Sequence, residues 1–500
     1  MKKTIIDYLK LNVEKNQNKM AFVDSKRSID FNDLYNESRK IASSLLVEKN
    51  KPIPIFIDKE VSCISVMMGI VQSGNFYTIL DTLMPINRVD AILEVLDAKY
   101  LITTRKYEDK VKDFSFNGTV LFYEDLINND IDSDYLLIRE KQIIDIDPMY
   151  ILFTSGSTGI PKGTVLSHKA VLSYLSWFTE EFEINEETVF GNQTPLYFSM
   201  SVSDVLSTIF SGATLYLIPK TCFSFPIKLV DYINENKINT IYWVPSALGI
   251  VSNFKVFDVK QITTLKKVLF AGEVMPTKVL NYWMDNLPNV KYSNLYGPTE
   301  TTDICTFYTV DRKFESNESL PIGKSCNNCD VIIINENNGL CEIDEIGELY
   351  VRGSFLANGY YKNKEKTNEV FIQNPINDNY PEIVYKTGDL VKYTETNEIM
   401  YVGRKDYQIK HMGYRIELGE IETNINSIDK INELACIYDD DKSLIVLYYS
   451  GFVSENDIVE FARKNLLAYM QPNKIIKLDS LPHNANGKID RKKLKEMLGD

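Results

Sequence analysis

The chain has 500 residues, of which 44% are hydrophobic and 25% are charged, and it carries a formal net charge of −14. This composition is typical of a globular protein with two or three domains, and the negative charge argues against a nucleic-acid binder that neutralises phosphates. No apolar run reaches the length of a membrane span. Asp7 and Lys10 interrupt the apolar core that an N-terminal secretory signal would need. We therefore expect a cytoplasmic protein without a membrane span.

Cysteine and histidine are scarce. Seven scattered cysteines, an odd number, argue against a disulfide scaffold. The motif Cys326-Asn-Asn-Cys329 has no second pair and no neighbouring histidine, so we expect two free thiols rather than a zinc site. Of the three histidines, His411 and His483 are expected at the surface without a catalytic role. Chemistry is therefore expected from carboxylates, lysines, hydroxyls and backbone amides, or from a cofactor.

Short apolar runs alternate with longer helical patterns through the first half of the chain. The pattern predicts strands at 53–58, 76–81 and 100–104, with helices at 63–74 and 91–98 between them. The alternation then continues to about Gly272. Strands and helices that alternate in this way are typical of parallel sheets covered by helices.

The pattern changes after about residue 330, where strand-like runs joined by turns predict a β-rich subdomain. After Arg404 a compact segment mixes helical and strand patterns. We place a boundary at about 403–406, because glycine and charged residues suit an exposed hinge. The predicted fold class is α/β. It has a large N-terminal domain (1–403) of helix-covered sheets plus the β-rich subdomain, and a small mobile α+β C-terminal domain (404–500).

The segment FTSGSTGIPKGTVLSH at 153–168 is rich in Gly, Ser and Thr and contains Lys162. Glycines let backbone amides turn toward an anion, hydroxyls add donors, and the lysine adds a positive charge. A strand-like run precedes the segment and a helix-like run follows it, although it lacks the Walker pattern. A polyphosphate-binding loop is therefore predicted in preference to a flexible surface linker.

This segment closely resembles the phosphate loop of the adenylate-forming enzymes, which include acyl-CoA synthetases, luciferases and peptide-synthetase adenylation domains. Other segments similar to this superfamily follow in family order at 73–81, 294–302, 347–361, 385–390, 403–422 and 486–490. The resemblance spans nearly the whole chain and fits the peptide-synthetase type best, with a layout similar to that of stand-alone D-alanine–carrier-protein ligases. It implies a reaction of a carboxylate with the α-phosphate of ATP, in which cations and dipoles offset the repulsion between two anions.

The resemblance implies an ATP and Mg²⁺ site. Tyr296 would lie against the adenine face, with Asn294 at its amino edge. Thr299 would donate to the α-phosphate, and Glu300 would hold Mg²⁺, which prefers hard oxygen ligands. Asp389 would accept from the ribose hydroxyls. The other implied ATP-binding residues are Thr154, Ser155, Gly156, Ser157, Thr158, Gly159, Lys162, Gly272, Glu273, Leu295, Gly297 and Arg404.

Four residues near the C-terminus are assigned by the same resemblance. Lys488 in NGKID would be catalytic, because a flexible ammonium can bridge the substrate carboxylate and the α-phosphate as charge builds between them. Asp406 would be the hinge about which the small domain rotates after adenylation. Lys410 and Gly413 would then face the second half-reaction, in which a thiol takes the acyl group.

The acid pocket departs most from the family pattern. Peptide-synthetase adenylation domains usually carry Phe-Asp here, and the Asp pairs with the substrate α-ammonium. In this chain Phe198 is followed by Ser199, and a buried ammonium without a carboxylate is costly. Two readings stay open. The sequence slightly favours a small polar acid whose hydroxyls or carbonyl are bound by Ser199, Ser203 and Ser246. The alternative is a β-, γ- or shifted α-amino acid paired with Asp303, or with Asp204 if the alignment is shifted slightly. The other pocket residues implied by this alignment are Met200, Ser203, Ser246, Leu269, Ala271, Leu295 and Ile304.

The function expected is activation of a small carboxylic acid as its adenylate, then transfer to the phosphopantetheine thiol of a separate carrier protein. No carrier-domain motif follows Asp490, so a free-standing ligase is expected. One alternative is an acid–coenzyme A ligase, which thiol competition would distinguish. Another is a catalytically silent binding or scaffold protein on the same fold. Against it, the residues expected for catalysis are all present: Lys162, Glu300, Asp389, Arg404, Asp406 and Lys488.

Overall fold

The structure is a computed structural model that describes residues 2–154, 161–315, 318–405, 408–440, 442–483 and 489–498. Two compact units divide the chain. The first comprises Met1–Thr82, Leu96–Leu152 and Gly163–Lys405, and the second comprises Leu83–Val95, Phe153–Lys162 and Asp406–Asp500. The mixed α/β fold class is confirmed, with a large N-terminal assembly of sheets and helices and a smaller C-terminal domain.

The first sheet contains the strands predicted at the start of the chain, in the order β6-β5-β3-β4-β7-β8. Strand β3 pairs in parallel with β4 and β5, and β5 pairs in parallel with β6. The bounds are β3 Pro52–Phe56, β4 Phe76–Ile79, β5 Tyr100–Thr103, β6 Thr119–Phe122, β7 Pro148–Thr154 and β8 Lys162–Ser167. The strands predicted at 53–58, 76–81 and 100–104 are confirmed to within a few residues.

A second sheet has the order β15-β14-β13-β12-β11-β9-β10-β1-β2. Strands β10, β9, β11, β12 and β13 run parallel, and β14, β15 and β2 add antiparallel edges. The bounds are β1 Met20–Val23, β2 Ser28–Asp30, β9 Val189–Asn192, β10 Thr214–Leu217, β11 Thr240–Trp243, β12 Lys267–Ala271, β13 Lys291–Tyr296, β14 Thr306–Thr309 and β15 Lys324–Ser325.

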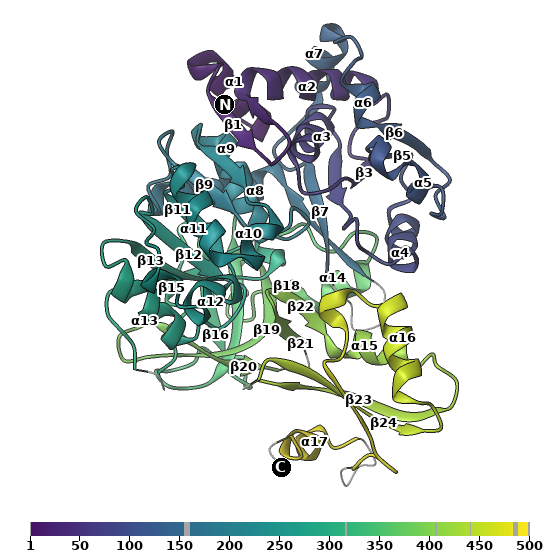
Figure 1. Cartoon of the computed structure of the whole chain (residues 1–500), viewed down its shortest axis with the longest axis vertical. Coiled ribbons are helices and arrows are strands. Elements are labelled where there is room, and N and C mark those ends of the chain that lie inside the picture. Colours follow the sequence, from purple (N-terminus) through teal and green to yellow (C-terminus); the bar gives the residue numbers. More distant parts are fainter. Residues whose placement is uncertain are drawn as a thin grey trace. The chain divides into compact units, whose positions relative to one another are not determined.

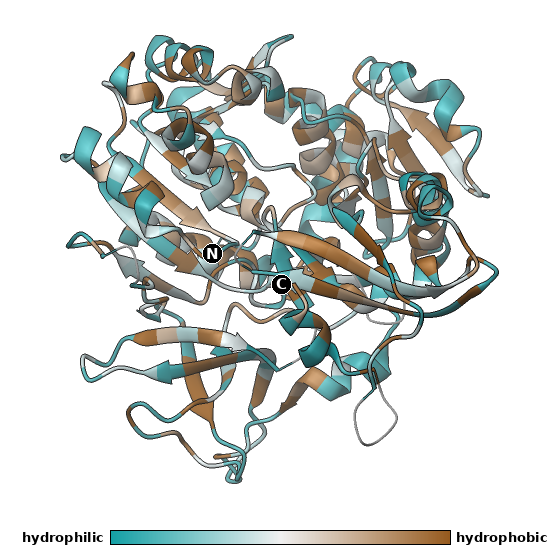
Figure 2. Ribbon diagram, turned by 60° about the horizontal axis from the view of Figure 1, so that its bottom comes forward, coloured by the Kyte–Doolittle hydropathy of each residue, from teal (hydrophilic) through white to brown (hydrophobic). Residues whose placement is uncertain are grey.

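Helices α8 and α9 pack on each other and α1 packs on α9 and α2, among the helices of the first unit (Figure 1). Figure 2 shows strands with long brown apolar stretches and helices that alternate brown and teal, as expected for sheets covered by amphipathic helices. The helix bounds in this unit are α1 Ile5–Asn16, α2 Phe31–Ser44, α3 Val61–Gln72, α5 Glu108–Val111, α6 Tyr123–Leu126, α7 Ser133–Gln142, α8 His168–Glu181, α9 Met200–Ser211, α10 Lys220–Ser224, α11 Pro226–Glu235, α12 Pro245–Asn253, α13 Thr277–Asn286 and α14 Lys364–Val370.

Local signals fix the ends of the two helices that matter most for the site. The Ser167 hydroxyl accepts from the backbone N–H of Ala170, which caps the start of α8. Helix α9 ends at Gly212, whose φ of +74° is the left-handed conformation that glycine adopts without strain. A Cβ at Gly212 would also lie 2.8 Å from the Asn12 side-chain oxygen. The turn after α9 therefore requires glycine.

The β-rich region after residue 330 is a third, antiparallel sheet of the first unit, with order β16-β17-β19-β18 and β20 paired to β19. Asp389 on β19 lies opposite Arg404 on β20 in the register of that pair. The bounds are β16 Cys329–Ile334, β17 Gly347–Gly353, β18 Phe371–Gln373, β19 Ile383–Tyr393 and β20 Ile399–Arg404. The predicted β-rich subdomain is therefore confirmed.

The second unit combines helices and small sheets, as the α+β pattern indicated. A hairpin joins β21 to β22, and β24 pairs antiparallel with β23 and parallel with β25. Its own apolar core includes Ala435, Tyr448 and Leu494. The bounds are α4 Ile86–Leu96, β21 Gln408–His411, β22 Tyr414–Glu417, α15 Leu418–Ile425, β23 Ile431–Asp439, β24 Leu444–Gly451, α16 Glu455–Asn465, β25 Lys474–Lys477 and α17 Arg491–Glu496.

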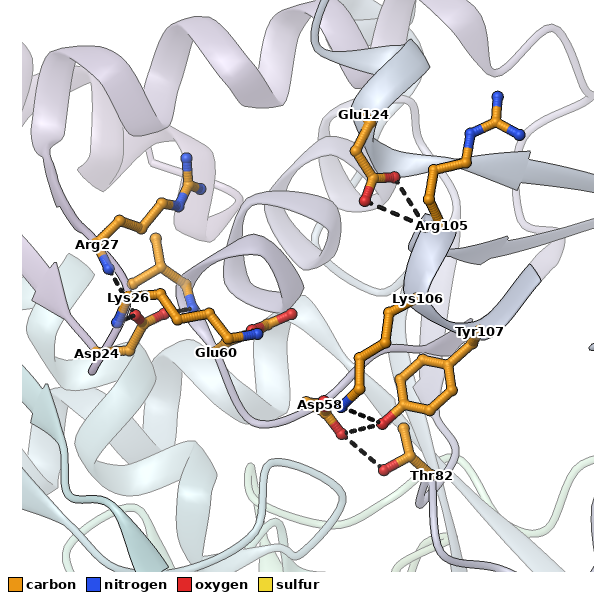
Figure 3. A network of polar contacts seen from close by, with 11 residues as sticks. Asp24, Lys26, Arg27, Asp58, Glu60, Thr82, Arg105, Lys106, Tyr107 and Glu124 are labelled. Atoms are coloured by element: carbon orange, nitrogen blue, oxygen red, sulfur yellow. Dashed lines mark hydrogen bonds and ion pairs between the residues drawn. The ribbon is translucent and has the colours of Figure 1, made fainter. Parts of the chain in front are cut away.

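A polar network joins the loops that follow β1, β3, β4 and β5 (Figure 3). The Asp58 carboxylate accepts from Lys106, Tyr107 and Thr82. Asp24 accepts from the backbone N–H of Val61 at 2.7 Å, which ties the loop after β1 to the start of α3. These contacts hold the loops of neighbouring strands together. Among the residues the structure describes, no helix is long and apolar enough to cross a membrane.

Candidate active site

A cluster of three side chains in the first unit gathers residues implied for nucleotide binding. Arg404 donates to Asp389 Oδ1 at 2.8 Å, and the Tyr296 hydroxyl donates to Asp389 Oδ2. Both members of the Asp389–Arg404 ion pair are buried, with 2% and 9% of their side chains exposed. Burial, and after it the neighbouring Asp389 charge, raises the pKa of Tyr296 well above its usual value. The phenol therefore stays protonated and remains a donor.

Glu300 lies in the turn after β13, four residues beyond Tyr296. Glu300 is fully buried in a short 3-10 helix (Thr299–Thr301), and its Oε1 accepts from the Tyr360 hydroxyl at 2.7 Å. Its backbone oxygen accepts from Ala357 N–H at 2.9 Å. A buried carboxylate is a hard-oxygen donor that fits Mg²⁺. Sequence reasoning did not identify Tyr360.

This turn is tightly folded. Thr302 has a φ of +71°, which is uncommon for a residue with a side chain, and its hydroxyl donates to Phe355 O at 2.8 Å. A Cβ on Gly297 would lie 2.3 Å from the backbone oxygen of Asp303 and 2.5 Å from the Cα of Ile304. Only glycine allows this close approach, so Gly297 is needed for Asp303 to fold back beside it.

The remaining nucleotide candidates of the first unit are placed on the ends of β12 and β13. Asn294 is buried and its amide donates to Pro321 O at 2.8 Å. Gly272 directly follows β12 with a φ of +89°. Glu273 accepts from the backbone N–H of Ser246 at 2.7 Å. Leu295 and Thr299 are both buried on the segment that leads into the turn.

The phosphate segment lies partly outside the described residues. Ser155, Gly156, Ser157, Thr158 and Gly159 are in the part of the chain that the structure does not describe. Thr154 is the last residue of β7. Its hydroxyl is buried and has no hydrogen-bond partner among the described residues.

An unpaired buried hydroxyl is costly unless a ligand satisfies it, which fits a bound phosphate. Lys162, the first residue of β8, lies 3.6 Å from the Glu417 carboxylate within the second unit.

The acid pocket candidates meet around a buried carboxylate, Asp303, which is 1% exposed. Its Oδ2 accepts from Ser203 on α9 at 2.5 Å, from Tyr242 on β11 at 3.1 Å and from Tyr174 on α8 at 3.3 Å. Helix α9 contacts both α8 and β11 (Figure 1). The hydroxyls of Tyr174 and Ser203 also bond each other at 2.6 Å.

Burial raises the pKa of Asp303 to about 6, and the hydroxyls of Ser203, Tyr242, Ser199 and Tyr174 limit that rise. The carboxyl is therefore mostly ionised at neutral pH. Tyr174 and Tyr242 were missed by sequence reasoning, because no motif surrounds either one.

The other candidates for the acid pocket differ in their exposure to solvent. Ser246 is exposed at the start of α12, so it is not part of the buried hydroxyl cluster, and Phe198 is half-buried. The remaining candidates are buried: Ser199, Met200, Leu269, Ala271, Leu295 and Ile304.

Asp204, the alternative carboxylate, belongs to a separate contact group. Asn192 donates its side-chain amide to Asp204 Oδ2 at 2.8 Å, and Lys59 donates to the backbone oxygens of Asn192 and Gln193 at 3.1 and 2.9 Å. Burial raises the pKa of Asp204 to about 7 and lowers that of Lys59 to about 7. Asp204 thus has an amide partner, whereas the donors to Asp303 among the described residues are hydroxyls.

In the second unit, Lys410 lies on β21 opposite Arg415, and Gly413 in the hairpin turn has a φ of +80°. The assigned hinge Asp406 and the assigned catalytic Lys488 lie outside the described residues. His411 is buried and contacts the Tyr438 hydroxyl at 3.3 Å, so its expected surface position is wrong.

The three thiols behind the acid pocket are free. Cys326 and Cys329 are buried, as is Cys305, and burial raises the pKa of Cys326 and Cys329 well above the usual range. Thiols held protonated in this way are poor nucleophiles.

Comparison with known proteins agrees with this geometry. A family model of the AMP-binding enzymes matches residues 9–361, and a model of their C-terminal domain matches residues 420–488. The chain therefore belongs to the AMP-binding enzyme family, which includes ligases, and the resemblance seen in its motifs is confirmed.

Tyrocidine synthase 1 of Brevibacillus parabrevis is 30% identical over 491 residues, which cover 96% of this chain and 43% of that protein. The chain thus spans less than half the length of that relative. A D-alanine–D-alanyl carrier protein ligase of Bacillus velezensis is 29% identical, with 98% of this chain and 99% of that protein covered. A solved o-succinylbenzoate CoA synthetase of Bacillus subtilis has the same fold, with a TM-score of 0.84, 20% identity and 98% of each chain covered.

Proposed function

We propose that this protein activates a small carboxylic acid with ATP and passes the acyl group to a phosphopantetheine thiol on a separate carrier protein. The observation that supports this most is the short segment from Tyr296 to Asp303. Its first residue belongs to the Tyr296–Asp389–Arg404 cluster, its middle residue is the buried Glu300, and its last residue is the pocket carboxylate. A nucleotide side and an acid side are thus adjacent in one turn, as adenylate formation requires.

In the first half-reaction, a substrate carboxylate oxygen would attack the α-phosphorus of ATP. The bond from that phosphorus to the oxygen bridging it to the β-phosphorus breaks, and pyrophosphate leaves with its electron pair. Glu300 fits Mg²⁺, which when bound neutralises phosphate charge. Asp389 and Arg404 would orient the ribose, Thr299 would donate to the α-phosphate, and Lys488 would offset charge between the two reactants.

In the second half-reaction, the thiolate would attack the acyl carbon, and AMP would leave with the bridging oxygen. Between the two half-reactions, we propose that the domain 404–500 rotates about Asp406 and so changes which of its residues face the site. Lys488 would leave the site as Lys410 and Gly413 approach it.

A carrier protein is favoured because the D-alanine–D-alanyl carrier protein ligase matches this chain end to end. Coenzyme A is the second candidate, because the o-succinylbenzoate CoA synthetase shares the fold over nearly the whole chain.

Acid-dependent exchange of labelled pyrophosphate into ATP tests acid activation. Lys488→Ala should reduce exchange at least 100-fold, because a charge that acts on the transition state is lost. Lys492→Ala, in the same basic tail, is the matched control and should keep exchange within twofold. Equal exchange by both variants would contradict the role of Lys488, and absence of exchange with every acid would contradict the proposed activity.

The acceptor is tested by competition. A holo carrier protein and coenzyme A are offered together to the enzyme loaded with its adenylate, and both thioesters are quantified by mass spectrometry. A carrier thioester in excess is the expected product. A coenzyme A thioester in excess would identify a coenzyme A ligase instead.

A further inference from the structure

Asp303 is a buried carboxylate surrounded by hydroxyl donors. Ser203, Tyr242 and Tyr174 all donate to its Oδ2, and the Ser199 hydroxyl is a fourth hydrogen-bond partner of this carboxylate. Among the described residues, no lysine or arginine forms an ion pair with it, and no cation is among the groups that set its pKa. Its negative charge is therefore uncompensated within the part of the chain that the structure describes.

Such an arrangement is expensive for a purely structural role. An ionised carboxylate loses several kcal/mol on burial unless an opposite charge accompanies it. An asparagine or a serine would bond the same hydroxyls without a charge. The three hydroxyls come from α8, α9 and β11, so three separate elements contribute to keeping this carboxylate ionised. A buried anion maintained in this way suits a cationic ligand.

The serines next to Asp303 can form hydrogen bonds with a ligand but carry no charge. Asp303 lies three residues after Glu300, and Ser199, the N-cap residue of α9, lies four residues before Ser203. The Ser199 hydroxyl also lowers the pKa of Asp303, so it lies on the same side as Ser203. The hydroxyl oxygen of Ser199 can accept a hydrogen bond from an ammonium group. It cannot neutralise the charge.

We propose that Asp303 is the counter-ion for a protonated amine of the substrate, so that the acid activated is an amino acid whose ammonium group binds beside Asp303. The inference rests on the proposed function and narrows it. Asp303 Oδ1 accepts from the ammonium, Ser199 provides a neutral acceptor, and the hydroxyls on Oδ2 fix the orientation of the carboxylate. Asp204 is not part of this subsite, because it lies in a separate contact group with Asn192, where burial raises its pKa and the charge of Lys59 already acts on it and lowers that pKa.

The first test compares acids in matched pairs. Pyrophosphate exchange is measured with α-, β- and γ-amino acids, each beside the hydroxy acid and the unsubstituted acid of the same carbon skeleton. The best amino acid should exceed both of its partners at least 100-fold in kcat/KM, because the site is built for a positive charge. Equal values for the three would overturn the assignment of Asp303 and leave acid activation standing. Absence of pyrophosphate exchange with every acid would overturn the proposed function, and this assignment with it.

The second test replaces the carboxylate. Asp303→Asn should lower kcat/KM for the best amino acid at least 100-fold and remove its advantage over the hydroxy acid. Affinity for ATP, measured by calorimetry without acid, should stay within twofold. Asp204→Asn, on the same helix as Ser203, is the matched control and should retain the amine preference. An Asp303→Asn protein that still prefers the amine would overturn the proposal.

A milder variant guards against a folding defect. Tyr242→Phe removes one donor from Asp303 while keeping the ring, so the carboxylate should protonate at higher pH. The acid limb of the kcat/KM profile for the amino acid should move to higher pH, and the profile for a substrate without an amine should not follow it. An unchanged acid limb in a folded Tyr242→Phe protein would contradict the role of Asp303.

Discussion

Replacing Asp303 with asparagine should stabilise the protein in the absence of substrate. Burial raises the pKa of this carboxyl from 3.8 to about 6, a shift of about 2 units. At 1.36 kcal/mol per unit, the buried charge costs about 3 kcal/mol of folding free energy at pH 8. Asparagine removes the charge, although its amide N–H groups need partners and reduce the gain, so we expect a net gain of about 2 kcal/mol.

The gain should depend on pH in a defined direction. The folded state binds the Asp303 proton more tightly than the unfolded state, so the wild type loses stability as pH rises from about 4 to about 6. Asparagine does not titrate. The advantage of the variant should therefore be near its maximum at pH 8 and about half of that at pH 5. The titratable groups coupled to Asp303 are common to both proteins: Tyr150, Tyr174, Asp204, Tyr242 and Cys326.

Scanning calorimetry at pH 5 and pH 8 measures the difference. A unit of roughly 400 residues has an unfolding entropy of about 0.8 kcal/mol/K, so 2 kcal/mol corresponds to about 2–3 °C in Tm. Asp125→Asn, an exposed carboxylate paired with Arg105, is the control and should change Tm by less than 1 °C. If Asp303→Asn melts below the wild type at pH 8 and the gap does not narrow toward pH 5, the charge is not uncompensated and the reasoning fails.

Three further predictions concern the nucleotide side and the turn. Gly297→Ala should abolish exchange and lower Tm by several degrees, since its Cβ would lie 2.3 Å from the Asp303 backbone oxygen; a folded, active variant would contradict the tight turn. Tyr360→Phe should raise the Mg²⁺ concentration needed for half-maximal exchange several-fold, because Glu300 loses its anchor; an unchanged Mg²⁺ titration would separate Glu300 from the metal. Asp389→Asn should raise KM for ATP at least tenfold with the order of acid preference unchanged, and an altered order would place Asp389 on the acid side instead.

The fold class and the family of this protein can be predicted from short stretches of its sequence. The alternation of apolar runs gives the parallel sheets, because strands covered on both faces need continuous apolar residues and the intervening helices need one apolar face. The β-rich texture after residue 330 and the α+β pattern after Arg404 are equally local. The order of the motifs around Lys162, Tyr296 and Asp389 identifies the family. Each of these features depends on residues that are near one another along the chain.

The composition of the acid pocket depends on tertiary structure. Tyr174 and Tyr242 reach Asp303 across 129 and 61 residues of sequence, from a helix and a strand with no distinguishing motif. The sequence left Asp204 open as an alternative to Asp303, and only the fold gives Asp204 an amide partner and Asp303 a set of hydroxyls. The physical reason is that a buried charge is defined by its neighbours in space. Those neighbours are chosen by the packing of α8, α9 and β11, which no short stretch of sequence encodes.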